Sequence, residues 1–321
     1  MPARMCSATG SGKIIRARNS RACKELDIIK TVLITGGSRG IGRAAVERFF
    51  REGWAVAFGW LHAEEEMRRL CARLPGITAI RADLADPAGC ESLVRSAEQA
   101  LGHLDGLVLN AGTALPQGLL TDLSLEDWDR LFAVNVRSAF LCCRAALPGM
   151  IRRHQGSIVT LSSMWGQTGG SCEAAYSASK AAVIGLTRAL AKEVGPSGVR
   201  VNCVAPGVIS TDMNRSLSEA DFAALREETP LGVIGSPEET ADAIWYFTAC
   251  ASFVTGQVLG VNGGMVISES RSDRLAVKSV FLCRQSAENL PGQFCKFQRP
   301  VPKFCPLNKV SLGASLKFRN L

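Results

Sequence analysis

The sequence predicts a single doubly wound α/β domain with a seven-stranded parallel sheet over residues 31–267. Two observations predict this class: short apolar runs alternate with segments of helical periodicity, and a glycine-rich turn follows the first apolar run. Runs this short and this apolar are typical of strands that helices cover on both faces, as in a parallel sheet. The apolar runs lie at 31–35, 54–60, 77–82, 104–109, 157–161, 199–204 and 257–261.

Helical patterns lie between these runs and complete a series of βαβ units, so we expect a Rossmann-type architecture. The helical segments are 44–52, 64–73, 88–101, 128–153 and 174–194.

The first predicted strand leads into a turn that contains Gly36, Gly40 and Gly42. Glycines permit a tight turn and a close approach of the backbone to a pyrophosphate, and the amides of the following helix favour the negative charge. A glycine motif alone is weak evidence. Its place between a strand and a helix is what predicts a dinucleotide-binding turn.

The second predicted strand ends at residues 57–60 without a carboxylate. An acid at this point would accept the ribose hydroxyls of NAD and would repel a 2′-phosphate. Arg39, inside the glycine turn, offers a forked cation for a phosphate. The pattern therefore favours NADP over NAD. The three glutamates at 64–66 indicate a solvated helix start, although any one of them near the phosphate would weaken its binding.

Tyr176 and Lys180 stand four residues apart in the predicted helix 174–194 and share one face of it. The ammonium can approach the phenol and the ribose of a bound cofactor, and its charge favours the phenolate. An unperturbed tyrosine, with a pKa of about 10, transfers protons poorly at pH 7. Such a pair alone is more often a solvated helix face. With the glycine turn and Ser163, thirteen residues earlier, it indicates a nicotinamide-dependent oxidoreductase.

These residues show that the stretch from about 30 to 267 resembles the short-chain dehydrogenases/reductases. The resemblance implies a catalytic set of Asn135, Ser163, Tyr176 and Lys180. It also implies a cofactor-binding set of Gly36, Ser38, Arg39, Gly40, Ile41, Gly42, Asp83, Leu84, Asn110, Ala111, Gly112, Tyr176, Lys180, Pro206, Gly207, Ile209 and Thr211. Asp83 would contact adenine, and Ile209 with Thr211 would hold the nicotinamide carboxamide. Leu109 departs from the pattern, because the family usually has a second asparagine there.

A ketone that gains a hydride becomes an incipient alkoxide, which needs a proton and a stabilising donor. We expect Tyr176 to give the proton, Ser163 to hydrogen-bond the carbonyl oxygen, and Lys180 to tune Tyr176 and bind the ribose. Ser162 competes with Ser163 for this role. Asn135 would hold a water that relays protons, or would merely bridge a helix to a strand.

Within the family, the segments 209–217 and 261–265 are similar to bacterial 3-oxoacyl-[acyl-carrier-protein] reductases. That resemblance implies reduction of a 3-oxoacyl group in fatty acid biosynthesis and an acyl carrier protein as partner. Against it, the two arginines that dock the carrier protein fall on His154 and Ser197. The neighbouring Arg152 and Arg153 would partly compensate.

Three alternatives stay open. The loop 163–173 resembles reductases of a 5-aminopentanone group on elongation factor P, where Glu173 would attract a substrate amine or would be a helix-start carboxylate without a ligand. Another small-ketone or sugar reductase is the next alternative. A non-catalytic NADP-binding sensor is an answer of a different class, which the intact Ser163, Tyr176 and Lys180 oppose.

The positive net charge of +8 belongs to the two ends of the chain. Residues 31–267 hold 20 Lys and Arg against 24 Asp and Glu, so we expect no nucleic-acid partner. Residues 1–30 are interpreted as a basic, disordered extension, with a transit peptide as the alternative, and residues 268–321 as a basic, mostly irregular tail. Apolar runs are too short for a bilayer, so we expect no membrane span and a cytoplasmic location.

The twelve cysteines include no Cys-x-x-Cys pair and read as reduced residues. The three histidines lack zinc-ligand spacing, so we expect no metal. The resemblance implies a homotetramer that uses the helices beginning near Trp128 and Ala174 and the last strand. Phe140, Leu141, Ile184 and Leu186 fit either that interface or the core.

Overall fold

The computed structural model describes residues 29–214 and 217–267, and the predictions for residues 1–28 and 268–321 lie outside them. Its centre is one seven-stranded sheet in which every neighbouring pair is parallel. The strand order is β3-β2-β1-β4-β5-β6-β7. The strands are β1 (Thr31–Ile34), β2 (Ala55–Trp60), β3 (Thr78–Arg81), β4 (Gly106–Leu109), β5 (Gly156–Leu161), β6 (Val199–Pro206) and β7 (Val258–Val261).

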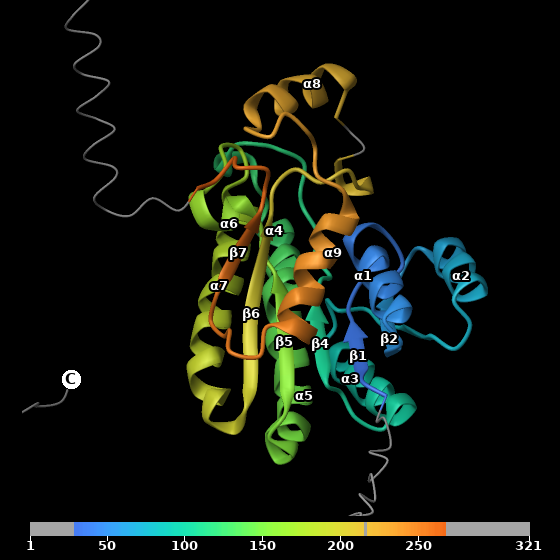
Figure 1. The fold of residues 1–321 in the computed structure, drawn as a ribbon. Coiled ribbons are helices and arrows are strands. Elements are labelled where there is room, and N and C mark those ends of the chain that lie inside the picture. The colour runs from blue at the N-terminus through green and yellow to red at the C-terminus, as the bar shows by residue number, and fades with distance from the viewer. Residues whose placement is uncertain (1–28, 215–216, 268–321) are drawn as a thin grey trace, which may run out of the picture. The chain divides into compact units, whose positions relative to one another are not determined.

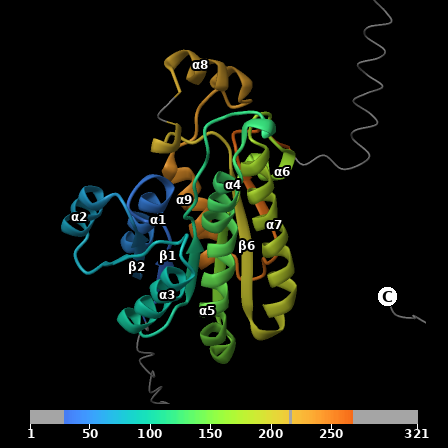
Figure 2. The ribbon, with the colours of Figure 1, turned by 180° about the vertical axis from the view of Figure 1, so that it is seen from behind.

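Helices cover both faces of this sheet, as Figures 1 and 2 show from opposite sides. One face carries α3 (Pro87–Leu101), α5 (Ser138–Arg153) and α7 (Ala174–Val194). The other carries α1 (Gly40–Arg51) and α9 (Pro237–Trp245), with α2 (Glu64–Arg73) beside α1. The shorter helices are α4 (Leu125–Phe132), α6 (Met164–Thr168) and α8 (Glu219–Glu228). The predicted doubly wound architecture is confirmed.

Alternate residues of the central strands enter separate cores on the two faces. Leu33 of β1 packs with α3 and α5, whereas Val32 and Ile34 pack with α1 and α9. This burial on both sides explains why the strands are apolar runs without alternation. Leu109, the departure from the family pattern, is buried in the first of these cores.

The order of the strands reverses between β1 and β4, which follow opposite directions along the sheet. In open parallel sheets, ligands bind at the carboxyl ends of the strands beside such a reversal. The glycine turn follows β1 and residues 110–112 follow β4, so both lie at that edge. The topology therefore places the predicted cofactor turn beside the predicted catalytic residues.

The predicted helix 128–153 is divided in the structure. It consists of α4, a π-helix η2 (Ala133–Arg137) and α5. The sequence did not predict α6, α8 or α9. Both α8 and α9 begin with capping boxes, Ser218 with Asp221 and Ser236 with Glu239, which are signals that sequence reading can use.

Among the described residues, one helical stretch, Leu125–Arg153, has the length and apolarity to cross a membrane, with a mean hydropathy of 1.3. The sequence predicted no such stretch. Half of its apolar window is buried inside the protein, where α5 packs against α3 and β5. Packing within the domain therefore accounts for the buried half of this stretch.

Candidate active site

The glycine turn is braced by the loop that follows β4. The Asn110 side chain donates from Nδ2 to the carbonyl oxygens of Thr35 and Gly36, at 3.0 and 3.1 Å. Gly36 has a φ of +66°, which favours glycine. A Cβ on Gly42 would lie 2.1 Å from the Gly36 carbonyl oxygen, so only glycine lets α1 begin this close to the turn.

The same loop connects the cofactor turn to the catalytic residues. The Ala111 backbone N–H donates to the Thr35 hydroxyl over 2.9 Å. A Cβ built on Gly112 would lie 3.1 Å from Lys180 Nζ and 3.3 Å from Asn135 Oδ1. Residues 110–112 therefore lie between the glycine turn and the side chains of Asn135 and Lys180.

Two adjacent serines follow β5, and their hydroxyl groups have different partners. The Ser162 hydroxyl is buried and donates to the Lys180 carbonyl oxygen at 2.8 Å, so it holds α7 to the sheet. The Ser163 hydroxyl caps α6 by accepting from the Trp165 backbone N–H and also hydrogen-bonds the Tyr176 side chain. Of the two candidates, Ser163 is the serine whose hydroxyl meets the phenol.

Tyr176 and Lys180 lie together on α7, with Lys180 Nζ 5.6 Å from the centroid of the Tyr176 ring. Burial raises the pKa of Tyr176 to about 12, and the nearby Glu173 carboxylate adds to the rise, while the hydrogen bond with Ser163 opposes it. Burial also lowers the pKa of Lys180 to about 8. The predicted lowering of the tyrosine pKa by Lys180 is thus not what the structure shows, because burial of both groups outweighs their proximity.

Asn135 lies in the π-helix η2 and is almost fully buried. Its Oδ1 accepts from the Thr113 N–H at 2.8 Å, and its Nδ2 donates to the Thr113 carbonyl and to the Ser179 hydroxyl. The side chain therefore ties the long helix to the loop after β4 and to α7. The alternative expected for Asn135 was a bridge from a helix to a strand; the structure shows a bridge to a loop and to the first turns of α7, which carry Tyr176.

Lys180 carries the best evidence that the site fits a nicotinamide dinucleotide. Its buried Nζ donates to the Leu161 carbonyl oxygen at 3.0 Å, the one hydrogen bond of this ammonium within the described part of the chain. An ammonium has three donors, so two N–H groups are available for a polar ligand such as the ribose hydroxyls. The glycine turn and Lys180 lie at the same edge of the sheet, so one dinucleotide can reach both.

The segment after β6 reaches the glycine turn. Gly207 donates its N–H to the Val261 carbonyl, and a Cβ on Gly40 would lie 3.4 Å from the Thr211 methyl group. Arg39, at the start of α1, forms an exposed ion pair with Asp212 at 3.8 Å. The segment that includes Pro206, Ile209 and Thr211 is therefore beside the predicted pyrophosphate site.

The remaining predicted cofactor residues lie around the same edge. Asp83 and Leu84 follow β3, and the Asp83 carboxylate accepts from the Ala85 N–H. Ser38 is buried in the turn, and Ile41 packs against the core beneath α1. All four residues therefore lie in or next to the loops that follow β1 and β3.

Glu173 precedes α7 and is half-buried close to the phenol of Tyr176. Burial raises the pKa of Glu173, opposed by a hydrogen bond with Gln117. The carboxylate makes no side-chain capping bond to α7. Its position near the phenol means that a substrate held by Ser163 and Tyr176 would meet its charge.

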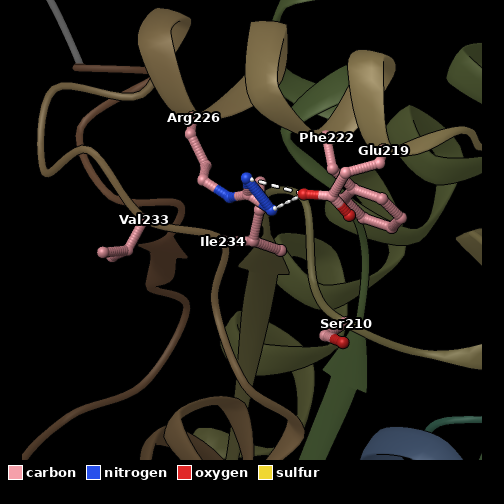
Figure 3. Close-up of a pocket in the computed structure, with 6 residues that line it drawn as sticks. All are labelled: Ser210, Glu219, Phe222, Arg226, Val233 and Ile234. Carbon is pink, nitrogen blue, oxygen red and sulfur yellow. Dashed lines mark hydrogen bonds and ion pairs between the residues drawn. The ribbon is translucent and has the colours of Figure 1, made fainter.

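A pocket of about 380 Å³ opens beneath α8, and Figure 3 shows its lining. Arg226 and Glu219, both on α8, form an ion pair along one wall of it, with 2.7 Å between Nη2 and Oε1. Ser210 links it to the segment after β6. The sequence missed these residues because α8 was not predicted. The pocket is lined by Ser210, Glu219, Phe222, Arg226, Val233 and Ile234.

No group of three or more metal-ligating side chains is arranged for an ion in residues 29–214 and 217–267. The seven cysteines in these ranges are free.

Comparisons with known proteins agree with this geometry. The family model described as Enoyl-(Acyl carrier protein) reductase matches residues 36–266. The chain is 38% identical over 241 residues to an uncharacterized oxidoreductase, YmfI, of Bacillus subtilis, which covers 73% of this chain and 98% of that protein. It is 38% identical over 242 residues to the 3-oxoacyl-[acyl-carrier-protein] reductase FabG of Thermotoga maritima, covering 74% of this chain and 98% of that one.

A solved structure, titled gox2181, has the same fold. It superposes with a TM-score of 0.70 at 29% identity, and the match covers 74% of this chain and 95% of that one. The relatives therefore span the described domain almost in full.

Proposed function

Because the chain belongs to the short-chain dehydrogenase/reductase family, we propose that it reduces a ketone to a secondary alcohol with NADPH, and that the ketone is a 3-oxoacyl thioester. The observation that carries this proposal is the meeting of the Ser163 and Tyr176 hydroxyls. Two donors that converge in this way can hold one carbonyl oxygen while it acquires negative charge.

The reduced cofactor would supply the hydride. On the protein side, Ser163 hydrogen-bonds the carbonyl oxygen and orients the ketone. Tyr176 is protonated at neutral pH, since its pKa is about 12, and it therefore serves as the proton donor to the developing alkoxide. The bond from Lys180 to the Leu161 carbonyl leaves two N–H groups of the ammonium available, and these hold the ribose.

NADP is favoured over NAD by the end of β2. The structure places Trp60, not an acid, at that position. Glu64 and Glu65 of α2 pair with Arg68 and Arg69 along the helix, so their charges are partly offset. Arg39 at the start of α1 is a further cation, in an exposed ion pair with Asp212.

The 3-oxoacyl assignment is supported by the names of the relatives from Thermotoga maritima and Salmonella typhimurium, both 3-oxoacyl-[acyl-carrier-protein] reductases. The latter is 36% identical over 238 residues. Docking of an acyl carrier protein would fall to exposed basic residues at the end of α5. Arg153 there is held by the Leu104 carbonyl, while Arg152 is exposed.

One observation favours a second candidate. Glu173 is half-buried and its carboxylate acts on the Tyr176 phenol, so it is the acid that we expect to attract the ammonium of a ketone with a distal amine. A 5-aminopentanone group on elongation factor P has that chemistry. A plain acyl chain gains nothing from a carboxylate in this position.

A substrate panel tests these proposals. Purified protein would receive NADPH or NADH with an acetoacetyl thioester on acyl carrier protein, elongation factor P carrying the aminoketone, or a crotonyl thioester as the matched enoyl control. We expect NADPH consumption with the acetoacetyl thioester alone. Turnover of the aminoketone alone would establish the second candidate, and turnover of the crotonyl thioester alone would contradict both.

Cofactor binding without turnover of any ketone would favour a sensor. In that case Tyr176→Phe would bind NADPH as the wild type does and differ from it in no reaction. For an enzyme, we expect this variant to keep the cofactor and lose the reaction.

We also propose a homotetramer, as in the family. Leu141 and Ile184 are buried in the core and Leu186 packs against it, which leaves Phe140, 46% exposed on α5, as the interface residue among the four candidates. Tyr246 and Leu259, toward the last strand, are also exposed. Phe140 lies on the helical stretch and Leu259 on the strand that we expect to form these contacts, whereas Tyr246 lies in η5 (Tyr246–Cys250).

A further inference from the structure

The carboxyl ends of β2 and β3 lie against the glycine turn. The Gly37 N–H donates to the Gly59 carbonyl over 2.9 Å, so the turn is fastened to the last residues of β2. The Ala82 N–H donates to the Trp60 carbonyl at the same distance, and Trp60 stands opposite Arg81 in the register of the two strands. The glycine turn, Trp60 and Arg81 therefore form one continuous surface at this edge of the sheet.

Arg81 is fixed on that surface by the indole of Trp60. The carbon of its guanidinium lies over the indole ring, 5.6 Å from the centroid. Stacking of this kind positions a guanidinium while its edge keeps its N–H donors. Within residues 29–214 and 217–267, Arg81 has no hydrogen bond or ion pair, and it is exposed. Its donors are thus directed at no protein acceptor.

Carboxylates of the neighbouring segments have other partners and do not pair with Arg81. Glu64 and Glu65, at the start of α2, pair with Arg68 and Arg69. The Asp83 carboxylate, two residues beyond Arg81, accepts from the Ala85 N–H. An exposed, oriented guanidinium with no carboxylate partner is suited to an external dianion, because a phosphate can accept two parallel N–H bonds from it.

We propose that Arg81, held by Trp60, is a second cation for the 2′-phosphate of NADP, in addition to Arg39. The inference rests on the proposed use of NADP and extends it to residues that no motif identifies. Sequence reading missed Arg81 because it lies inside the third apolar run, and its contact with Trp60 exists only through the pairing of β2 with β3. The ligand class is a phosphate monoester on a ribose.

Binding of two nucleotides that lack nicotinamide tests the proposal without turnover. Isothermal titration would compare 2′,5′-ADP, which carries the 2′-phosphate, with ADP, which does not. For Arg81→Met, which keeps a stem on the indole and removes the charge, we expect 2′,5′-ADP to bind about tenfold more weakly, the scale of one hydrogen-bonded charge. ADP affinity should stay within about twofold.

Arg95→Met is the matched control, because Arg95 is also exposed but lies on α3. It removes the same charge and should leave both nucleotides unaffected. Arg81→Lys keeps the charge without the planar fork, and we expect it to recover part of the 2′,5′-ADP affinity. Thermal unfolding of each variant would show that the fold is retained.

The outcomes separate this inference from the function it rests on. If the wild type binds both nucleotides equally, the preference for NADP is wrong and this inference falls with it. If the wild type prefers 2′,5′-ADP and Arg81→Met preserves that preference, the role of Arg81 alone is wrong. An equal loss for both nucleotides would likewise contradict recognition of the 2′-phosphate.

Discussion

The hydroxyl of Ser163 serves two neighbours, because it caps α6 and hydrogen-bonds Tyr176. The Ser162 hydroxyl beside it serves only the Lys180 carbonyl. The two successive serines therefore have separate roles: Ser163 takes part in the proposed catalysis, and Ser162 attaches α7 to the sheet. The distinction follows from the alternation of side chains at the end of a strand, which points successive residues to opposite sides.

Replacing each serine by alanine should separate these roles. We expect Ser163→Ala to lower kcat by about 10²–10³, as for loss of one oxyanion donor. Ser162→Ala should lower the free energy of unfolding by about 1 kcal/mol, since a buried acceptor loses its donor, and should lower kcat by less than about tenfold. Steady-state kinetics and denaturant unfolding measure both. Equal kinetic losses would show that the two hydroxyls are not divided in this way.

Lys180 has a proposed role in the reaction, but its burial destabilises the folded protein. Burial lowers its pKa from 10.5 to about 8, so the unfolded chain binds more protons than the folded one between these values. The contribution of Lys180 to stability is therefore fully present above pH 10.5 and is lost as the pH falls through about 8. At neutral pH the folded protein carries a buried charge at a cost.

We expect Lys180→Met to raise the free energy of unfolding of the cofactor-free protein at pH 7 by about 1–2 kcal/mol, net of the donor lost to the Leu161 carbonyl. The difference from the wild type should shrink as the pH rises from 8 to 10.5. Denaturant unfolding across this range measures it. A variant that is less stable at pH 7 would show that the ammonium is not paying a burial penalty.

At the residue scale, the sequence indicated which residues form the candidate site but not how deeply each one is buried. Spacing located Ser163, Tyr176 and Lys180, because the distance along a strand, turn and helix determines where they meet. Spacing contains no measure of burial, so the expected lowering of the Tyr176 pKa was wrong in sign. Glu173 was noticed, but its half-buried position beside the phenol depends on the folded loop.

At the scale of elements, the helices α8 and α9 begin with the same capping motif but cover different parts of the protein. Each has a serine cap and an acidic residue three positions on that completes a capping box. In α9 the residues Thr240, Ala241, Ala243 and Ile244 are buried, whereas α8 has no buried residue. The core thus holds α9, and local bonds hold α8 over its pocket.

Removing the two caps should have different effects. Ser236→Ala is expected to lower the free energy of unfolding of the domain by about 1 kcal/mol. Ser218→Ala should leave global unfolding unchanged and should increase hydrogen exchange in α8, because this helix opens locally. Denaturant unfolding and hydrogen exchange of the two variants provide the measurement. A global loss from Ser218→Ala would mean that α8 is part of the cooperative core.

These two helices were missed because the sequence was read for apolar periodicity. The helix α8 has little, since it covers a pocket and not the core. Their capping boxes were a local signal that did not depend on burial. By contrast, all seven strands were found. The five inner strands are almost entirely buried and are therefore apolar runs in the sequence, whereas the edge strands β3 and β7 are only partly covered.

At the scale of the whole molecule, the described domain leaves large apolar side chains on its surface. Phe140 projects from α5 beneath Arg144, whose guanidinium lies 5.3 Å from the ring centroid. Tyr246 and Leu259 are exposed toward the last strand. In an assembled tetramer these side chains would be covered, which would remove apolar area from water.

We expect Phe140→Glu to reduce the assembly to a smaller oligomer, because a charge would be placed in an apolar interface. Light scattering after size-exclusion chromatography gives the mass. Leu231→Glu is the control, since Leu231 is 73% exposed and lies outside the helices and strand of the proposed contacts. A monomeric wild type, or an unchanged mass for Phe140→Glu, would contradict the role of this residue.

In the π-helix η2, the number of residues matters as much as their identity, because it sets where the side chains point. A π-turn holds about one residue more than an α-turn, so deletion of a single residue other than Asn135 from Ala133–Arg137 would return this stretch to an ordinary α-helix. Asn135 would then face away from Thr113 and Ser179. One missing codon, with every catalytic side chain still encoded, would be enough to silence the enzyme.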